Sequence, residues 1–348
     1  MGNTVKEYPI PSRFNAKKVG LVSRVPYQEV AEEARTWAKK NGILHAAKDK
    51  IKICLLPIDT QNTFCIPDFE LFVGGRSGTG AVEDNIRLCE FIYRNLGTIT
   101  EISPTLDTHT AMQIFHIPFW IDKNGSHPAP ATIITVDDVE KEKWMVNPAV
   151  TRSILGDSKM FWYLKQHGLH YVKKLATGRY PLMVWPFHAM LGGIGHALVS
   201  SVEEALFFHN IARSSQTDFQ IKGGNPLTEN YSVLRPEVLE GPDGRAIAQK
   251  NADFIKKLLS FDVVIIAGQA MSHCVAWTID DLLNEIMAQD PELVKKIYIL
   301  KECTSPVVIP GVIDFTDQAE EAFRRFADAG MHVVKSTDSI ETWPDISL

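Results

Sequence analysis

The sequence predicts an α/β protein: a doubly wound, mostly parallel sheet in three layers, with helices on both faces. Strand-like and helix-like segments alternate along its 348 residues, which is typical of parallel strands joined by crossover helices. One strand-like segment, residues 261–268 (FDVVIIAG), is apolar at almost every position, as a central strand buried on both faces should be. The content of hydrophobic residues, 45%, and of charged residues, 22%, is that of an ordinary globular chain.

The predicted elements follow from local patterns in the chain. A helix is predicted at 27–42, with Gly42 as its stop. Further helices are predicted at 81–97, 158–176, 200–214, 244–260, 273–289 and 316–330. Strands are predicted at 52–59, 98–107, 180–186, 261–268, 296–302 and 331–336. Within 200–214, Ser201 and Glu204 have the spacing of a capping box.

Domain organisation is predicted from where this alternation begins and where it fails. Residues 1–26 are proline-containing and show little periodicity, so we expect residues 1–50 to form an arm and a helix. Residues 51–348 are expected to form one domain. Segment 108–157 fits the alternation poorly, and we expect an insertion of loops and short strands around residues 115–157.

Composition argues against several classes of function. The net charge is −6 and the basic residues are scattered, so we expect no nucleic-acid partner. No apolar run is long enough for a membrane span, and the first residues lack the apolar core of a signal peptide. The five cysteines are widely spread and form no CxxC pair, which favours a reduced, cytoplasmic protein. They are Cys54, Cys65, Cys89, Cys274 and Cys303.

Polar residues that could take part in catalysis or bind a metal follow several of the predicted strands. Asp59, Asp107, His188 and Cys274 each stand at or just after a strand-like segment. In parallel sheets the ligand lies beyond the carboxyl ends of the strands. These residues are therefore expected along one edge of the sheet.

Cys274 has two interpretations. Free cysteines are often buried as small hydrophobic residues. Alternatively, a thiol in the first turn of a helix is stabilised as a thiolate by the helix N–H groups, which could also hold an oxyanion. A nucleophile needs a base or a charged neighbour, and Asp59 and a lysine are candidates. Asp59 could equally cap the loop after its strand.

Asp107 and His109 are a candidate metal pair, because alternate residues of an extended segment share a face. With a third histidine they would suit zinc, iron or manganese. The glycine-rich segment 74–86 does not have the spacing of a dinucleotide-binding loop, and the chain has no P-loop lysine. We therefore expect no nucleotide cofactor.

Five segments, in order, resemble the motifs of nicotinamidases, cysteine hydrolases of the isochorismatase-like superfamily. They are LLPIDTQNTFC (55–65), LDTHT (106–110), VWPFHAMLGGIGHAL (184–198), FQIKGGNPLTENYSVL (219–234) and IIAGQAMSHCVAWTIDDLL (265–283). The resemblance implies the isochorismatase-like fold, hydrolysis of a small, aromatic amide such as nicotinamide, and frequent homo-oligomers.

The resemblance also implies roles for individual residues. The catalytic triad would be Asp59, Lys222 and Cys274, with Asp59 accepting the thiol proton and Lys222 supplying positive charge. A non-proline cis peptide bond is implied near Gln269–Ala270, where the N–H groups of Ala270 and Cys274 would hold the oxyanion.

A divalent metal and a substrate pocket are implied in the same way. The metal ligands would be Asp107, His109 and His188. Phe64, Trp185 and Tyr231 would line or stack on the substrate ring. The other histidines that we considered are expected to be structural or surface residues, because no motif places them: His116, His127, His170 and His196.

The sequence departs from the nicotinamidase pattern around the metal motif, where Thr108, Thr110 and Gln113 replace the usual residues. Two alternatives therefore stay open. One is a hydrolase of another C–N bond, such as a carbamoyl or ureido group. The other is a non-catalytic protein that binds a small molecule on the same fold.

Overall fold

The computed structural model describes residues 6–346, which fall into two compact units. The first unit contains residues 6–106, 197–220 and 252–346, and the second contains 107–196 and 221–251. The segment expected as an arm and helix is grouped with the first unit. The expected insertion around 115–157 falls inside the second.

The first unit is built on a five-stranded parallel sheet in the order β13-β10-β9-β1-β2. Its strands are β1 (Ile53–Ile58), β2 (Glu101–Ile102), β9 (Val263–Gly268), β10 (Ile297–Leu300) and β13 (His332–Val334). Every residue of β1 and β9 is buried, which agrees with their nearly continuous apolar sequences. The predicted parallel α/β class is confirmed.

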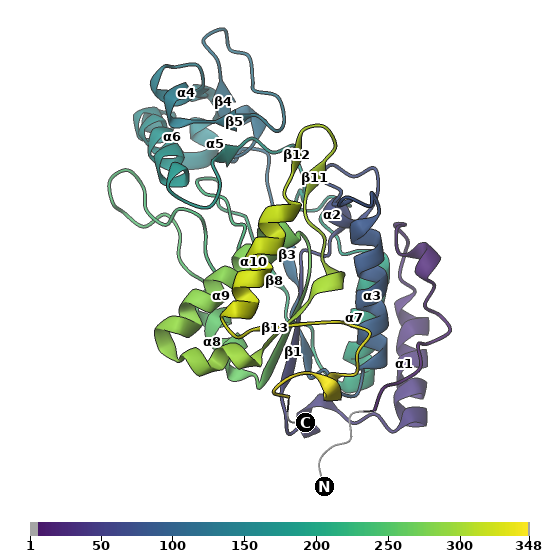
Figure 1. The fold of residues 1–348 in the computed structure, drawn as a ribbon. Coiled ribbons are helices and arrows are strands. Elements are labelled where there is room, and N and C mark those ends of the chain that lie inside the picture. The colour runs from purple at the N-terminus through teal and green to yellow at the C-terminus, as the bar shows by residue number, and fades with distance from the viewer. Residues whose placement is uncertain (1–5, 347–348) are drawn as a thin grey trace. The chain divides into compact units, whose positions relative to one another are not determined.

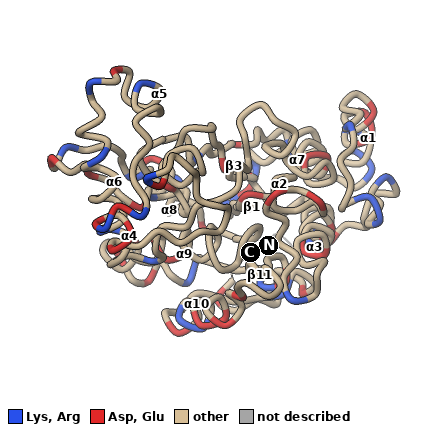
Figure 2. The backbone as a smooth tube through the Cα atoms, turned by 90° about the horizontal axis from the view of Figure 1, so that it is seen from above, with Lys and Arg blue, Asp and Glu red and all other residues tan. Residues whose placement is uncertain are grey.

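Helices cover both faces of this sheet (Figure 1). One face carries α1 (Tyr27–Asn41), α3 (Gly80–Arg94) and α7 (Ser200–Arg213). The other carries α8 (Ala252–Ser260), α9 (Ala276–Gln289) and α10 (Thr316–Asp328). The unit also contains the short helix α2 (Asn62–Cys65) and the antiparallel pair β11 (Val308–Ile309) and β12 (Ile313–Asp314). Acidic and basic residues both occur along α3 and α10 (Figure 2).

The ends of two helices test the predicted caps. Gly42 closes α1 as expected, with φ 66° and its N–H donating to the carbonyl oxygens of Ala38 and Lys39. The predicted capping box in α7 is not present. The helix begins at Ser200, so Ser201 is already helical, and no side chain caps the helix. Glu204 instead accepts a hydrogen bond from Arg13 Nε at 3.0 Å.

Three predicted elements are shorter than expected. The strand at 98–107 is split into β2 and β3 (Thr105–Asp107) around Pro104, which has no N–H to donate. Of the strand at 180–186 only β7 (Leu182–Met183) forms, and it pairs with β5 (Ile133–Ile134) rather than with the parallel sheet. Of the helix at 244–260 only α8 forms, because Ile247 N–H and Ala248 N–H donate to Leu239 O in a turn.

The second unit combines helices with short antiparallel strand pairs. Its helices are α4 (Val136–Glu140), α5 (Thr151–Leu155) and α6 (Phe161–Ala176). The paired strands are β4 (Trp120–Ile121) with β6 (Met145–Val146), and β5 (Ile133–Ile134) with β7. A Cβ at Gly168 would lie 2.5 Å from Val146, so the glycine lets α6 approach β6 closely. Strand β8 (Gln220–Lys222) begins in the first unit and enters the second.

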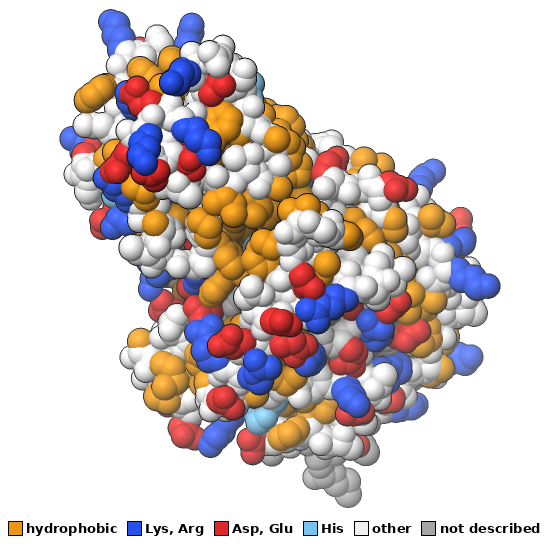
Figure 3. All heavy atoms as spheres, turned by 45° about the horizontal axis from the view of Figure 1, so that its top comes forward, with side chains coloured by type: hydrophobic (Ala, Val, Ile, Leu, Met, Phe, Trp, Pro, Cys, Tyr) orange, Lys and Arg blue, Asp and Glu red, His pale blue; other side chains and the backbone are white. Residues whose placement is uncertain are grey.

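Two observations concern the surface. Among residues 6–346, no helix is both long and apolar enough to cross a membrane. Side chains of Lys and Arg are interspersed with those of Asp and Glu over the face shown in Figure 3.

Gly268 is required where β9 leaves the sheet. Its φ is +109°, and an added Cβ would lie 2.0 Å from the carbonyl oxygen of Ile58. We expect Gly268→Ala to lower the free energy of unfolding in urea by about 4 kcal/mol or more, because backbone must move. Gly78→Ala is the matched control: φ is +80°, but nothing lies within 4 Å, so a loss of only about 1–2 kcal/mol is expected. Equal losses would contradict the role given to the close contact.

Candidate active site

Two candidate catalytic residues lie beyond the same edge of the parallel sheet. Strands β1 and β9 are neighbours, with Ile58 paired to Gly268 at their carboxyl ends. Asp59 follows Ile58 directly, and Cys274 lies six residues after Gly268. The first unit therefore presents a carboxylate and a thiol from adjacent strand ends, where α/β sheets bind ligands.

Asp59 is held in a specific orientation by Thr105, the first residue of β3. Asp59 is fully buried and has φ 46°, an uncommon backbone conformation outside glycine. Its N–H donates to Thr105 Oγ1 at 3.0 Å, and the Thr105 hydroxyl donates to Asp59 Oδ1. These bonds fix the carboxylate at the strand end.

Cys274 lies in a short helical turn between β9 and α9. The peptide bond between Gln269 and Ala270 is cis, as the resemblance implied. Met271–Val275 then form one π-helical turn that runs directly into α9, so Cys274 stands in this turn rather than in the first turn of an α-helix. The Ala270 carbonyl accepts from His273 N–H and Val275 N–H at 2.9 and 3.2 Å.

The N–H of Ala270 is a candidate oxyanion donor. No acceptor for this N–H is found within residues 6–346. Ala270 itself is buried, and Cys274 is only 8% exposed. A buried N–H without an acceptor is uncommon in proteins, and a transient negative charge would satisfy it.

The second unit brings the three predicted metal ligands together. Asp107 Oδ2 lies 2.9 Å from His109 Nε2 and 3.6 Å from His188 Nε2. One ligand atom of each residue lies within 4.8 Å of the others, and all three residues are buried. A carboxylate and two imidazoles suit zinc, iron or manganese.

Backbone carbonyls orient both imidazoles of this cluster. His109 Nδ1 lies 3.1 Å from Gly223 O, and His188 Nδ1 lies 2.8 Å from Pro186 O. A carbonyl can only accept, so each Nδ1 carries the proton and each Nε2 is left as a potential ligand atom. This arrangement is the usual second shell of a metal-binding histidine, so the residues present fit a metal.

Charge within the cluster shifts the titration of its members. Burial opposes ionisation of Asp107, but the charges of His109 and Lys222 prevail and hold its pKa well below the usual value. Burial opposes the protonation of His109, yet the Asp107 carboxylate prevails and raises the pKa of that imidazole. Burial and the neighbouring His109 lower the pKa of His188. An ionised carboxylate and a neutral His188 are the forms that bind metal.

Lys222 makes an ion pair with this cluster. Its buried Nζ lies 2.8 Å from Asp107 Oδ1 and donates to Asn230 O at 2.9 Å. The two oxygens of Asp107 therefore have different partners: Oδ1 faces the lysine and Oδ2 faces the imidazoles. Within the second unit, the ammonium stabilises the carboxylate that the metal would use.

Glu229 is a buried acid near this cluster that the sequence did not indicate. Its Oε1 accepts from Asn230 N–H at 3.0 Å. Burial raises the pKa of Glu229 to about 7, against the positive charges of His109 and Lys222 and assisted by the negative charge of Asp107. A single glutamate in a loop has no sequence pattern that distinguishes it from an exposed one.

Glu229 should make stability depend on pH. Because its folded pKa lies above the ordinary 4.5, the folded state binds the proton more tightly, and stability falls as pH rises from about 4.5 through 7. We expect Glu229→Gln to remove up to about 3 kcal/mol of this fall. Urea unfolding of wild type and variant at pH 5 and pH 8 measures the difference. An unchanged pH dependence in the variant would contradict the assignment.

The predicted ring-binding residues fall in both units. In the second unit Trp185 Nε1 donates to Tyr231 Oη at 3.2 Å, and Tyr180 packs edge-on against Tyr231. Phe64 belongs to α2 of the first unit, where it is buried. Trp185 and Tyr231 thus form one aromatic group.

Two histidines expected to be structural lie beside the metal cluster. The His116 ring is buried, with its centroid 5.5 Å from that of His109 and 5.7 Å from that of His188. His196 Nε2 lies 2.8 Å from the hydroxyl of Thr108, the residue between two candidate ligands. His127 and His170 instead bond to the carbonyls of Trp120 and Glu240. No spacing in the sequence distinguishes the two histidines beside the metal cluster from the two that lie elsewhere.

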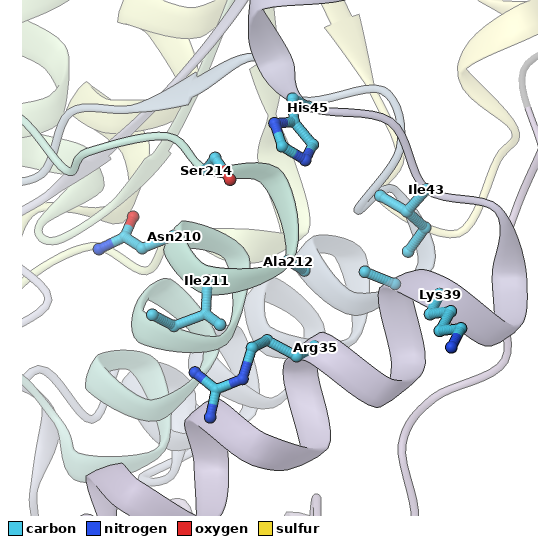
Figure 4. Close-up of a pocket in the computed structure, with 9 residues that line it drawn as sticks. Arg35, Lys39, Ile43, His45, Asn210, Ile211, Ala212 and Ser214 are labelled. Atoms are coloured by element: carbon cyan, nitrogen blue, oxygen red, sulfur yellow. The ribbon is translucent and has the colours of Figure 1, made fainter.

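A separate hollow of the first unit lies between α1 and α7 (Figure 4). It is lined by Arg35, Ala38, Lys39, Ile43, His45, Asn210, Ile211, Ala212 and Ser214. Neither Asp59 nor Cys274 is among these lining residues. Arg35 and Lys39 point to different sides in Figure 4, so their charges do not converge.

Comparisons with known proteins support the fold. Neither a protein-family model nor a curated protein matches the sequence. Among solved structures, the yeast nicotinamidase bound to the inhibitor nicotinaldehyde has 18% identity and a TM-score of 0.50, covering 81% of this chain and 99% of that chain. A nicotinamidase/pyrazinamidase from Acinetobacter baumannii has 17% identity and a TM-score of 0.46, with 84% and 99% covered. The likeness to the yeast structure confirms the fold that the resemblance implied.

Proposed function

We propose that this protein, whose fold is that of the yeast nicotinamidase, is a cysteine amidohydrolase of the isochorismatase-like superfamily. Nicotinamide, hydrolysed to nicotinate and ammonia, is the first substrate to test. The observation that carries the proposal is the edge of the parallel sheet, where Asp59 and the turn holding Cys274 follow two adjacent strands. The five ordered sequence motifs point to the same chemistry.

The proposed reaction uses Asp59 as the proton carrier. Asp59 accepts the thiol proton of Cys274, and the thiolate attacks the amide carbon. The N–H groups of Ala270 and Cys274 stabilise the oxyanion of the tetrahedral intermediate. Asp59 then gives its proton to the departing nitrogen, ammonia leaves, and a thioester remains. Asp59 next removes a proton from water, which attacks the thioester and releases the acid.

Lys222 is proposed as the third member of the triad, on the strength of its sequence motif. Its positive charge would favour both the thiolate and the ionised Asp59. Its ion pair with Asp107 supports a permanently charged ammonium, because two buried groups of opposite sign stabilise each other's ionised forms.

The proposed metal ligands are Asp107, His109 and His188. A bound zinc, iron or manganese ion would supply a Lewis acid that can hold a ring nitrogen of the substrate. Phe64, Trp185 and Tyr231 are proposed to contact the aromatic ring, since flat apolar side chains stack on such rings.

The cellular compartment is proposed from the cysteines, and the oligomeric state is proposed from the resemblance. All five cysteines lie among the described residues, where they are buried and form no disulfide, which suits a reduced compartment. We therefore propose a cytoplasmic enzyme, and a homo-oligomer because the resemblance implies one.

Ammonia release over a panel of small amides tests the proposal. Nicotinamide, pyrazinamide, benzamide, an N-carbamoyl amino acid and a ureido acid are compared, with metal content measured on the same samples. Release from the aromatic amides supports the proposal. Release from the carbamoyl or ureido compounds alone would favour hydrolysis of another C–N bond. If nothing is released and iodoacetamide does not label Cys274 selectively near neutral pH, the protein is a non-catalytic binder.

A further inference from the structure

The turn that carries Cys274 is joined to the rest of the first unit by the buried side-chain amide of Gln269. Gln269, the first residue after β9, is only 1% exposed. Its Nε2 donates to Asp84 Oδ2 at 2.8 Å, and its Oε1 accepts from the N–H of Ser305 at 3.3 Å. The side chain therefore uses both ends of its amide, one on helix α3 and one on the segment after β10.

Asp84 is itself fixed from several sides. It is buried on α3, and its Oδ1 accepts from Arg87 Nη2 at 2.9 Å. Burial raises its pKa to about 6, while hydrogen bonds from Ser305, Gln269 and Arg87 act in the opposite direction. At neutral pH the group is thus a carboxylate that accepts from three donors. Arg87 also donates to the carbonyl of Glu302, which ties α3 to the segment after β10.

The same segment holds the backbone of the turn. Met271 N–H donates to Ser305 O at 2.8 Å, and Val307 N–H donates to Ser272 Oγ at 3.0 Å. Gly80 allows the close approach, because a Cβ there would lie 2.5 Å from Ser305 Oγ. The residues on both sides of Ala270 are thereby attached to groups outside β9.

We propose that Asp84 and Gln269 are positioning residues for the reaction, acting through the turn that carries Ala270 and Cys274. The inference rests on the proposed function of that turn. Only a donor–acceptor side chain at 269 can satisfy both the carboxylate of Asp84 and the N–H of Ser305. The direction of this amide fixes where the turn lies, and a displacement of about 1 Å at a reacting group can lower a rate about a hundredfold.

Exchanging the acid and the amide tests this proposal. Gln269→Glu places two carboxylates against each other, and Asp84→Asn turns an NH₂ group toward either Gln269 or Arg87, which are both donors. In the double variant, the introduced asparagine would donate to the introduced glutamate and accept from Arg87, and the glutamate would also accept from the N–H of Ser305. The bond between residues 84 and 269, the bond from Arg87 and the bond from the Ser305 N–H are thereby restored, and the net charge is unchanged.

Each single variant is expected to lower kcat for the best amide of the panel by about tenfold or more, with KM within about threefold. The double variant should recover kcat to within about threefold of wild type. Asp49→Asn is the control, because Asp49 likewise accepts from an arginine, Arg213, but at the amino edge of the sheet. It should lower the unfolding midpoint and leave kcat unchanged.

The rate at which iodoacetamide alkylates Cys274 gives a readout that needs no substrate. It should fall severalfold in both single variants and recover in the double variant. If wild type hydrolyses none of the amides, the proposed function fails, and these alkylation rates still decide the positioning role. Single variants with wild-type kcat and alkylation rates, or a double variant worse than both singles, would overturn the inference.

Discussion

Replacing Cys274 by alanine is expected to lower kcat by at least about a thousandfold for whichever amide proves to be the substrate. No other thiol lies in the turn between β9 and α9, and loss of a covalent nucleophile leaves only binding and oxyanion stabilisation. The cost in unfolding free energy should be about 1 kcal/mol, since one buried sulfur atom is removed. Ammonia release and urea unfolding measure the two effects.

Cys65→Ala provides the matched control. Like Cys274, Cys65 is buried, forms no disulfide and follows a strand of the same sheet, in α2 after β1. Burial raises the pKa of its thiol, so it stays protonated. Its replacement should cost similar stability and leave kcat unchanged. Retention of activity in Cys274→Ala, or its loss in Cys65→Ala, would reject Cys274 as the nucleophile.

Gly223→Ala should strongly weaken metal binding. Gly223 has φ +83°, and an added Cβ would lie 2.7 Å from both Asp107 Oδ1 and His109 Cε1. The methyl group would have to displace two of the three proposed ligands, and Gly223 O also orients His109. Loss of ligand geometry lowers metal affinity at least about tenfold to a hundredfold. Equilibrium dialysis with zinc followed by metal analysis measures the loss directly.

The adjacent glycine supplies the control. Nothing lies within 4 Å of a Cβ at Gly224, so Gly224→Ala should bind metal as wild type does. Saturating zinc should also raise the unfolding midpoint of wild type and of Gly224→Ala, because a ligand stabilises the folded state that binds it. It should leave Gly223→Ala unchanged. Equal zinc affinity in the two variants would show that the metal, if bound, lies elsewhere.

The sequence by itself determined the class of fold and the main elements of the sheet. The continuous apolar runs of β1 and β9 require burial on both faces, and Gly42 ends α1 through a local backbone conformation. Asp59 and Cys274 could be placed at the edge of the sheet because a parallel strand determines where its own carboxyl end lies. Each of these features depends on residues that are close together in the chain.

Only the tertiary structure decided the contacts that depend on distant residues. Glu204 pairs with Arg13 rather than capping α7. Ile247 and Ala248 bond to Leu239 rather than extending α8. Lys222 binds the carboxylate of Asp107, 115 positions away, and Gln269 binds that of Asp84, 185 positions away. A buried polar group takes whichever partner the fold brings to it, because leaving it unpaired costs about 1–3 kcal/mol. The sequence pattern around such a group does not contain that partner, and so it could not predict the pairing.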